Sequence, residues 1–420
     1  MALNLGNYKM KSILTDSSIL TWIDDQALNM SKLLEKWVNI NSHSENLKGL
    51  GQMQAAILDE FASLGGTVRK IALPPRKRID VKGQLIEEPQ GNMLLITKHP
   101  KAPLKVLLGG HYDTVYPIDS SFQKAEYIEG NRMRGPGAAD MKGGLVIMLT
   151  ALQALERSSF AGKIGWEVFI SPNEEIGSSG AEEILVGAAK KNSFGLLFEP
   201  AFSDGSIVGA RKGSVNFTLV TRGKAAHAGR DFHLGRNAIT AIAQFIIKAE
   251  QLNNQDVGVT LNFGQIEGGG PVNVVPDLAI CRFNIRVISS KQLSDIREAL
   301  AKIIIDVQAL EGISFELYEQ SCRPPKLFDE TTENLYKIIA QCATDFGYQL
   351  KTKFSGGVCD GNILSEAGLP TIDTLGAVGG DIHTHEEYVD LDSLVQRSKL
   401  TAAVLCRLAT SSESPASLKD

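Results

Sequence analysis

Apolar positions follow two different periods along this chain, and each change of period marks a new element. Apolar residues recur at helical spacing across residues 19–65, and a Gly65-Gly66 pair follows them, so this region is predicted to be helical up to the pair. Strands are then predicted at 106–108, 164–170 and 195–198, with helices at 144–155 and 181–190 between them. Short apolar runs that alternate with helices indicate an α/β domain with a mostly parallel sheet flanked by helices.

The pattern changes after residue 208. Strands are predicted at 214–221, 258–266, 278–287 and 313–319, and helices at 237–252 and 291–308. The order β-α-β-β-α-β is that of a ferredoxin-like unit. The α/β pattern resumes after Pro324-Pro325, with a helix at 333–346, a strand at 370–373 and a helix at 391–408. We therefore predict a main domain formed by residues 1–208 and 321–420, with an inserted ferredoxin-like (βαββαβ) domain at 209–320.

Composition narrows the class of protein. The chain has 420 residues, of which 43% are hydrophobic and 22% charged, as in soluble globular proteins. A net charge of −5 gives no reason to expect nucleic acid or a membrane as partner, although a local basic pocket for an anionic substrate stays open. The five cysteines are scattered and odd in number, and the first residues contain no signal-peptide pattern. We therefore expect a cytoplasmic protein.

Two histidines and three carboxylates stand where predicted strands end or loops begin: His111, Asp140, Glu175, Glu199 and His383. Such a set suits two divalent ions about 3.5–4 Å apart, with one carboxylate bridging them. Glu174, beside Glu175, supplies a base that is not a ligand. The set therefore predicts metal-assisted hydrolysis. Taken singly, each signal has an ordinary explanation: Asp140 can equally cap the helix that follows it, and paired glutamates are often a solvated loop.

Six motifs resemble those of the zinc-dependent aminoacylase/carboxypeptidase superfamily, and in particular its carboxypeptidase G and acetylornithine deacetylase-like metallopeptidases. The resemblance covers nearly the whole chain. The motifs are GGHYDTVYP (109–117), GPGAADMKGG (135–144), SPNEEIGSSG (171–180), FEPA (198–201), GKAAHAG (223–229) and IHTHEEYVDLDSL (382–394). The resemblance implies that residues 1–208 and 321–420 form a catalytic domain and that residues 209–320 form a lid and dimerisation domain.

The same resemblance assigns roles in the metal centre, which would hold two Zn²⁺ per subunit, with Mn²⁺ or Co²⁺ as alternatives. His111 and Glu199 would bind one ion, Glu175 and His383 the other, and Asp140 would bridge them. Glu174 would be the general base, and Asp113 would orient His111. The resemblance also implies a cis peptide bond between Asp140 and Met141.

The last motif contains two candidate histidine ligands. In the family a glutamate commonly follows the ligand by four residues and an aromatic residue follows it by five. His383 satisfies this spacing with Glu387 and Tyr388, whereas His385 does not. We therefore predict His383 as the ligand and His385 as an exposed loop residue.

The resemblance further implies a homodimer with composite sites, in which His227 reaches the partner subunit's active site and stabilises the oxyanion. Asn273 and Arg286 would contact the substrate, and Arg286 would bind its carboxylate. Arg323 resembles, over a shorter match, an arginine that binds the glutamate end of the substrate in carboxypeptidase G. Gly356 and Gly357 would form a glycine-rich turn around the substrate.

Two departures from the carboxypeptidase G pattern affect the substrate. Cys359 stands where the family has a small hydroxyl residue, and Lys212 is displaced from a lysine that carboxypeptidase G uses. We expect cleavage of an amide or peptide bond next to a free carboxylate, with release of a C-terminal glutamate as one form of it. The alternative is deacylation of an N-acyl amino acid. A non-catalytic binding protein is disfavoured because the base and every ligand are present.

Overall fold

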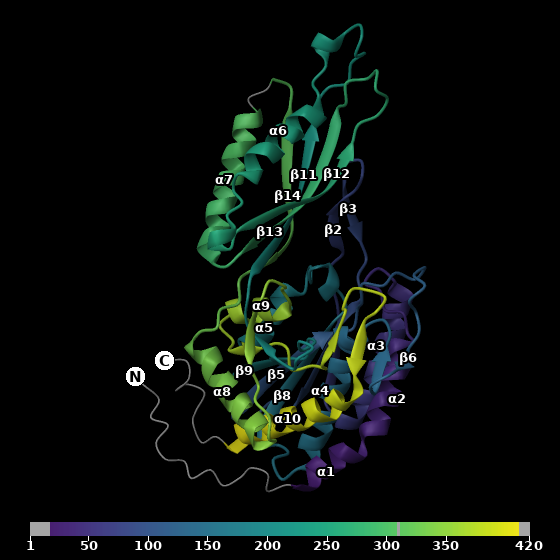
Figure 1. Cartoon of the computed structure of the whole chain (residues 1–420), viewed down its shortest axis with the longest axis vertical. Coiled ribbons are helices and arrows are strands. Elements are labelled where there is room, and N and C mark those ends of the chain that lie inside the picture. Colours follow the sequence, from purple (N-terminus) through teal and green to yellow (C-terminus); the bar gives the residue numbers. More distant parts are fainter. Residues whose placement is uncertain (1–16, 309–310, 411–420) are drawn as a thin grey trace.

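In the computed structural model, which describes residues 17–308 and 311–410, a six-stranded sheet runs through the lower of two lobes (Figure 1). Its strand order is β1 (Thr67–Ala72), β4 (Asn92–Lys98), β8 (Ile164–Ser171), β5 (Leu104–His111), β9 (Phe194–Leu197) and β16 (Thr371–Ile372). Strands β8, β5, β9 and β16 are paired in parallel, and β4 is antiparallel to both of its neighbours. The carboxyl ends of β8, β5 and β9 therefore meet at one edge of the sheet.

Helices cover both faces of this sheet. Along β4, Leu94 and Ile96 pack into the larger core, whereas Met93 and Leu95 pack into the smaller core on the opposite face. This period of two is that of a strand buried on both sides. The larger core is formed with α1 (Ser17–Asp25), α2 (Ala27–Val38), α3 (Leu47–Phe61), α4 (Gly143–Arg157), α8 (Glu330–Asp345) and α10 (Leu391–Thr410). The smaller core is formed with α5 (Glu182–Ala189) and α9 (Asp360–Glu366).

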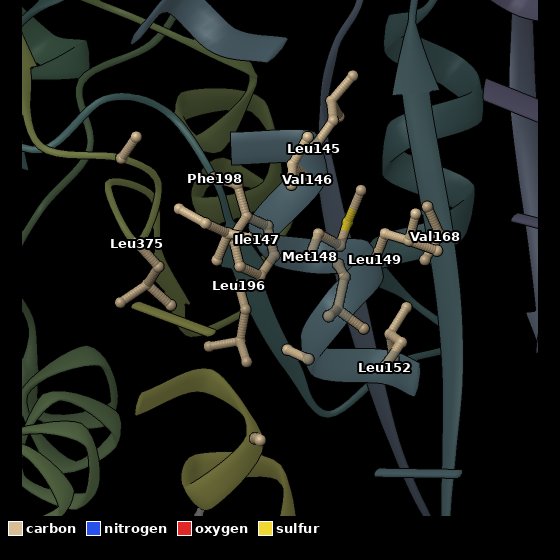
Figure 2. Close-up of a cluster of buried hydrophobic side chains, with 14 of the residues drawn as sticks. Leu145, Val146, Ile147, Met148, Leu149, Leu152, Val168, Leu196, Phe198 and Leu375 are labelled. Carbon is tan, nitrogen blue, oxygen red and sulfur yellow. The ribbon is translucent and has the colours of Figure 1, made fainter. Parts of the chain in front are cut away.

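Helix α4 packs against the sheet and is buried over most of its length. Figure 2 shows this helix with part of the larger core. Its side chains Leu145, Val146, Ile147, Met148, Leu149 and Leu152 share that core with Val168 of β8 and Leu196 of β9, and with Phe198 and Leu375 from the segments that follow β9 and β16. Among the described residues, the stretch Ala138–Arg157 alone is long and apolar enough to cross a membrane, with a mean hydropathy of 1.2. Its most apolar window is 94% buried inside the protein, which marks it as a core helix.

The upper lobe contains β11 (Gly213–Arg222), α6 (Ala238–Glu250), β12 (Thr260–Gly268), β13 (Leu278–Val287), α7 (Ser290–Gln308) and β14 (Ser314–Arg323). The four strands form an antiparallel sheet in the order β12-β13-β11-β14. Helices α6 and α7 pack on one face of it around a separate core that includes Phe245, Phe283 and Leu300. A hairpin of β2 (Arg76–Ile79) and β3 (Leu85–Glu88) rises from the lower lobe, and Ile79 packs with Val220 and Ile280 on the other face.

Two small sheets complete the lower lobe. One has the order β17 (Gly379–Gly380), β18 (Tyr388–Asp390), β7 (Arg132–Arg134) and β6 (Glu126–Ile128), and the other pairs β10 (Ile207–Arg211) in parallel with β15 (Thr352–Ser355). Short helical turns lie at Ala62–Leu64, Ala138–Lys142, Glu174–Ile176, Phe232–Leu234 and Gln255–Val257. Residues 19–65, which were predicted to be helical, contain three helices and a short helical turn. No strand was predicted at β1 to β4 or at the strands of the two small sheets.

The chain passes between the lobes twice, near Arg211 and near Lys326. A buried cluster of charged side chains joins these two segments. Arg211 and Lys326 exchange backbone hydrogen bonds of 2.9 and 3.1 Å. Their side chains share Asp373, which follows β16: Arg211 donates to both carboxylate oxygens at 2.9 and 3.0 Å, and Lys326 Nζ lies 3.0 Å from Oδ2. All three side chains are buried. Two cations against one carboxylate, away from water, make this junction sensitive to any loss of charge.

Candidate metal centre

The predicted ligands gather at the carboxyl edge of the parallel strands. His111 is the last residue of β5, Glu174 and Glu175 form the turn after β8, and Glu199 follows β9 by two residues. Asp140 lies in the turn Ala138–Lys142 before α4. His383 comes from the loop between β17 and β18, far along the chain. Sites in α/β proteins form at this edge because loops from adjacent parallel strands converge there.

Two groups of potential metal ligands share one carboxylate, that of Asp140. The first group joins Asp140 to His111 and Glu199, and the second joins it to Glu175 and His383, with the ligand atoms of each group within 4.8 Å of one another. Asp140 Oδ1 lies 3.1 Å from His111 Nε2, and Oδ2 lies 3.4 Å from His383 Nε2. Each oxygen of this carboxylate therefore faces a different imidazole, which is the arrangement that a bridging ligand needs.

The charges of the two groups are strongly coupled. Burial would lower the pKa of His111, but the nearby carboxylates of Glu199, Asp113 and Asp140 raise it well above its usual value. Hydrogen bonds to Asp140 and Glu175 raise the pKa of His383 to about 10. Burial, reinforced by the charge of Asp140, raises the pKa of Glu175 to about 7. The carboxylates thus favour protonated imidazoles at His111 and His383. Divalent cations can supply the same positive charge in place of those protons.

The donor set fits divalent metals. Imidazole nitrogens and carboxylate oxygens are ligands for Zn²⁺, Mn²⁺ and Co²⁺. Glu199 Oε1 is buried without a hydrogen-bond partner among the described residues, as expected for an oxygen that a cation would satisfy. His111 and Asp140 are both buried, whereas His383 is half exposed on its loop. The centre is therefore closed on the side of β5 and open on the side of His383.

Asp113 connects the first group to the turn that follows β8. Its Oδ1 lies 3.3 Å from His111 Nδ1, and its two oxygens accept backbone N–H bonds from Glu174 and Glu175 at 3.1 Å each. Ser44 donates a further hydrogen bond of 2.7 Å to Oδ2. His111 Nδ1 also lies 3.0 Å from the Asp113 carbonyl oxygen, so both acceptors on this nitrogen come from one residue. Asp113 thereby orients the imidazole and the turn together.

Glu174 lies beside the ligands without belonging to either group. Its side chain is 9% exposed, and its Oε1 lies 2.8 Å from Arg323 Nη2. Burial raises the pKa of Glu174 well above its usual value, and the Glu199 charge adds to this effect while Arg323 opposes it. The same Arg323 nitrogen donates to the Glu174 carbonyl at 3.0 Å and to Ser178 Oγ at 2.7 Å, and it lies 3.3 Å from Asp360. Arg323 is thus buried behind Glu174, and its described contacts are with the protein.

Two further expectations can be compared with the structure. The peptide bond between Asp140 and Met141 is cis, as the sequence resemblance implied. His385 is exposed, stacks on Phe122 with ring centroids 5.5 Å apart, and lies 3.4 Å from Ser120 Oγ. The choice of His383 over His385 therefore agrees with the position of each ring, since only His383 faces the carboxylates.

His227 and Asn273 lie together on the upper lobe. His227 is exposed and forms a bridge with Val274, and the Ala228 N–H donates to the Asn273 carbonyl at 2.8 Å. His227 Nδ1 accepts hydrogen bonds from the N–H groups of Gly229 and Arg230 at 3.1 and 3.2 Å. Since Nδ1 accepts these bonds, the ring proton lies on Nε2, which is left as a donor. The described contacts of His227 are all within the upper lobe.

Two arginines hold the glycine-rich turn that follows β15. Arg286 on β13 donates to the Gly356 carbonyl at 3.0 Å, and Arg211 donates to the Gly357 carbonyl at 3.2 Å. Both glycines are exposed. Arg286 is half buried, and its Nε donates a hydrogen bond to Asn284 Oδ1, so one edge of its guanidinium already has a partner within the protein. The turn therefore joins the strand of one lobe to the site edge of the other.

Cys359 and Lys212 have structural partners. Burial raises the pKa of the Cys359 thiol well above its usual value, and its Sγ accepts a hydrogen bond from the Gly361 N–H at the start of α9. A buried thiol with a raised pKa is a poor nucleophile. Lys212 Nζ donates to the Gly258 carbonyl in the upper lobe at 2.9 Å.

Sequence reasoning gave no role to Tyr116, Arg211 or Glu387, which the structure places around the site. Glu387 was noted only for its spacing from His383, and that spacing was the one available signal. Its carboxylate is fully buried and accepts N–H bonds from the turn that carries Asp140. Contacts of this kind join residues that lie about 250 positions apart, so no local pattern reveals them.

The sequence and the fold of the chain are similar to those of known hydrolases. Residues 107–407 match the family model described as peptidase family M20/M25/M40. The chain is 24% identical over 397 residues to carboxypeptidase G2 of Pseudomonas sp. (strain RS-16), covering 94% of this chain and 92% of that protein. It is 26% identical over 344 residues to succinyl-diaminopimelate desuccinylase 2 of Shewanella loihica, covering 74% of this chain and 87% of that protein. The fold is similar to that of the M20 family metallo-carboxypeptidase Sso-CP2 from Sulfolobus solfataricus, with a TM-score of 0.69 and 18% sequence identity. The match covers 90% of this chain and 98% of that protein.

Proposed function

The chain belongs to the M20/M25/M40 peptidase family and is a metal-dependent hydrolase of peptide or amide bonds; from this premise we propose that it cleaves such a bond next to a free carboxylate, using two divalent ions. The observation that carries the proposal is the pair of ligand groups that share Asp140, with Glu174 beside them. Zn²⁺ is the proposed metal, with Mn²⁺ or Co²⁺ as alternatives that the same donors accept.

In this proposal His111 and Glu199 would hold one ion and Glu175 and His383 the other, and the Asp140 carboxylate, which belongs to both groups, would serve both. Bound divalent ions of this kind lower the pKa of a water molecule toward neutrality and polarise a carbonyl group. Asp113 keeps His111 in the orientation in which Nε2 faces Asp140, as its contact with Nδ1 supports.

Glu174 is the proposed general base. Its Oε1 is held by Arg323, which leaves Oε2 to take the proton from the attacking water and pass it to the leaving amine. A carboxylate whose burial raises its pKa retains a proton long enough to deliver it. The contacts of Arg323 favour a role in holding Glu174 over the direct contact with substrate that the sequence resemblance implied.

The substrate carboxylate is assigned to Arg286, Asn273 and the turn at Gly356 and Gly357. Arg286 supports this assignment because it joins β13 to that turn while remaining half exposed. A guanidinium binds a carboxylate through two parallel N–H bonds, and a glycine turn lets backbone approach the ligand closely. Asn273 lies on the upper lobe beside His227, so its contact with substrate depends on how the lobes and subunits meet.

The upper lobe, about residues 209–320, is the proposed ferredoxin-like lid and dimerisation domain. Its strand order and its two helices on one face support this assignment. In a homodimer His227 would reach the partner's site, and its Nε2–H would donate to the oxyanion. Exposed apolar side chains on the segments that carry His227 and Asn273 favour a covered surface there: Phe232, Leu234, Val272 and Val274.

A deacylase acting on N-acyl amino acids is the second candidate. The similarity to desuccinylases supports it, and so does Lys212, which is bound to Gly258 rather than placed at the site. The two candidates differ in the bond that is cleaved: a dipeptide with C-terminal glutamate or aspartate in the first, and an N-acetyl or N-succinyl amino acid in the second.

A mass-spectrometric screen of both substrate classes tests the proposal. The purified protein, supplied with Zn²⁺, Mn²⁺ or Co²⁺ in turn, is incubated with the two sets of compounds, and Glu174→Gln protein serves as the blank. We expect free amino acid from at least one set with wild type alone. Release from acyl amino acids only would favour the deacylase, and release from neither set by wild type under any metal would reject both candidates.

A further inference from the structure

Glu387 is a fully buried carboxylate that no step of the proposed reaction uses. Its Oε1 accepts backbone N–H bonds from Ala139 at 2.9 Å and from Asp140 at 3.0 Å. Its Oε2 accepts a longer bond of 3.3 Å from Gly137 N–H. One side chain thus satisfies three N–H groups of the turn that presents Asp140, the carboxylate common to both ligand groups. Removing that acceptor would leave buried donors without partners.

Tyr116 extends this contact to the loop of His383. Its hydroxyl lies 2.7 Å from Glu387 Oε2 and 2.8 Å from the carbonyl oxygen of Thr384, the residue after His383. The Gly135 N–H also donates to the Glu387 carbonyl at 3.0 Å. The segment of the shared carboxylate and the segment of His383, about 240 residues apart, are therefore joined behind the site by two buried side chains.

The His383 loop needs such support. His383 and Asp381 both have positive φ values, 63° and 53°, a region that residues other than glycine seldom adopt. Conformations of this kind persist where the surrounding structure holds them, and they are common at functional sites. His383 is also half exposed, so packing on its own side chain does little to fix it. Tyr116 contacts this loop from a distant segment of the chain, through a hydrogen bond from its hydroxyl to the carbonyl oxygen of Thr384, the residue after His383.

We propose that Glu387 and Tyr116 are positioning residues for the metal centre, which set the distance between the Asp140 carboxylate and the His383 imidazole. The inference rests on the proposed function, in which both of those residues bind metal. A bridging carboxylate must keep each oxygen directed at a different ion, and here one oxygen faces His111 and the other faces His383. Groups that hold ligands from behind in this way typically contribute about 10–100-fold to metal affinity.

Cobalt titration of the full-length, metal-depleted protein tests this role without any substrate. Calorimetry gives affinity and stoichiometry, and the visible absorption of bound Co²⁺ reports the geometry of its ligands. We expect Glu387→Gln and Tyr116→Phe each to weaken Co²⁺ binding by about 10–100-fold and to change the visible spectrum. Glu386→Gln is the matched control: this neighbouring glutamate is exposed and pairs with Arg134 at the surface, so it should bind Co²⁺ as wild type does.

The possible outcomes separate this inference from the proposed function. A wild-type protein that binds no Co²⁺ would reject the metal centre itself. Wild-type affinity and spectrum in both variants would reject the positioning role alone, even where the variants lower the thermal midpoint of the metal-free protein, because a purely structural contact would do the same. Tyr116→Phe removes a single hydroxyl, so it decides the question if Glu387→Gln fails to fold.

Discussion

The ion cluster at the crossing between the lobes yields a prediction about stability that needs neither metal nor substrate. Asp373→Asn keeps the shape of the side chain and removes its charge, which leaves Arg211 and Lys326 buried without a counter-ion. Breaking a buried ion pair from one side costs about 3–5 kcal/mol, because the remaining charge is uncompensated. We therefore expect Asp373→Asn to lower the free energy of unfolding by about that amount at pH 7.

The titration of Asp373 gives a second measure of the same interaction. Burial alone would raise the pKa of this carboxyl above 3.8, but Arg211 and Lys326 outweigh it and hold the pKa at about 2. A group whose pKa is lower in the folded state stabilises the protein above its unfolded pKa. A difference of this size corresponds to roughly 2–3 kcal/mol. This contribution should be complete above about pH 4 and be lost as the pH falls toward 2. The variant lacks it at every pH.

Urea denaturation followed by tryptophan fluorescence measures the effect. The chain has three tryptophans: Trp37 and Trp166 lie in the larger core of the lower lobe, and Trp22 packs against that core. Asp373 follows β16 of the same lobe. Their fluorescence therefore reports the unfolding of that lobe. Asp204→Asn is the control, since Asp204 pairs with Lys353 at the surface with both side chains about half exposed. If the urea midpoint of Asp373→Asn matched that of Asp204→Asn, the buried cluster would not contribute as argued.

Three further outcomes concern the site. Glu174→Gln should retain its bound metal and lose about 10²–10⁴-fold in kcat, since general-base catalysis is typically of that size; loss of metal from this variant, with metal retained by Glu175→Gln, would reverse the two roles. Asp140→Ala should lower the occupancy of both ions in elemental analysis, and two tightly bound ions in this variant would contradict its bridging role. Glu174→Gln and His227→Ala proteins, each inactive alone, should regain roughly a quarter of wild-type activity after equal mixing and subunit exchange, because half the dimers are mixed and each has one intact site. A mixture that stays inactive despite proven exchange would show that His227 does not act across subunits.

Much of the architecture follows from local pattern. The period of two along residues 278–287 predicted β13 at its observed bounds, and the apolar run at 144–155 predicted α4 within two residues at each end. The ligand candidates could also be recognised from the sequence near each position, because they follow predicted strands and ligand sites form beyond the carboxyl ends of parallel strands. The strands β1 and β4 and the β2–β3 hairpin were missed. Strand β1 is largely exposed and the hairpin is rich in charge, so neither shows the apolar alternation by which strands are recognised.

The sequence by itself determined which residue types stand at the ends of the strands, and through resemblance it determined the reaction class. Only the tertiary structure decided which charges meet. Asp140 lies between His111 and His383, Arg323 lies behind Glu174, and Asp373 pairs with two cations, one from each crossing of the chain. Local periodicity records whether a position is buried, because burial depends on the face of its own helix or strand. The partner of a buried charge depends on how distant segments pack, and Coulomb interactions are strong only where that packing excludes water.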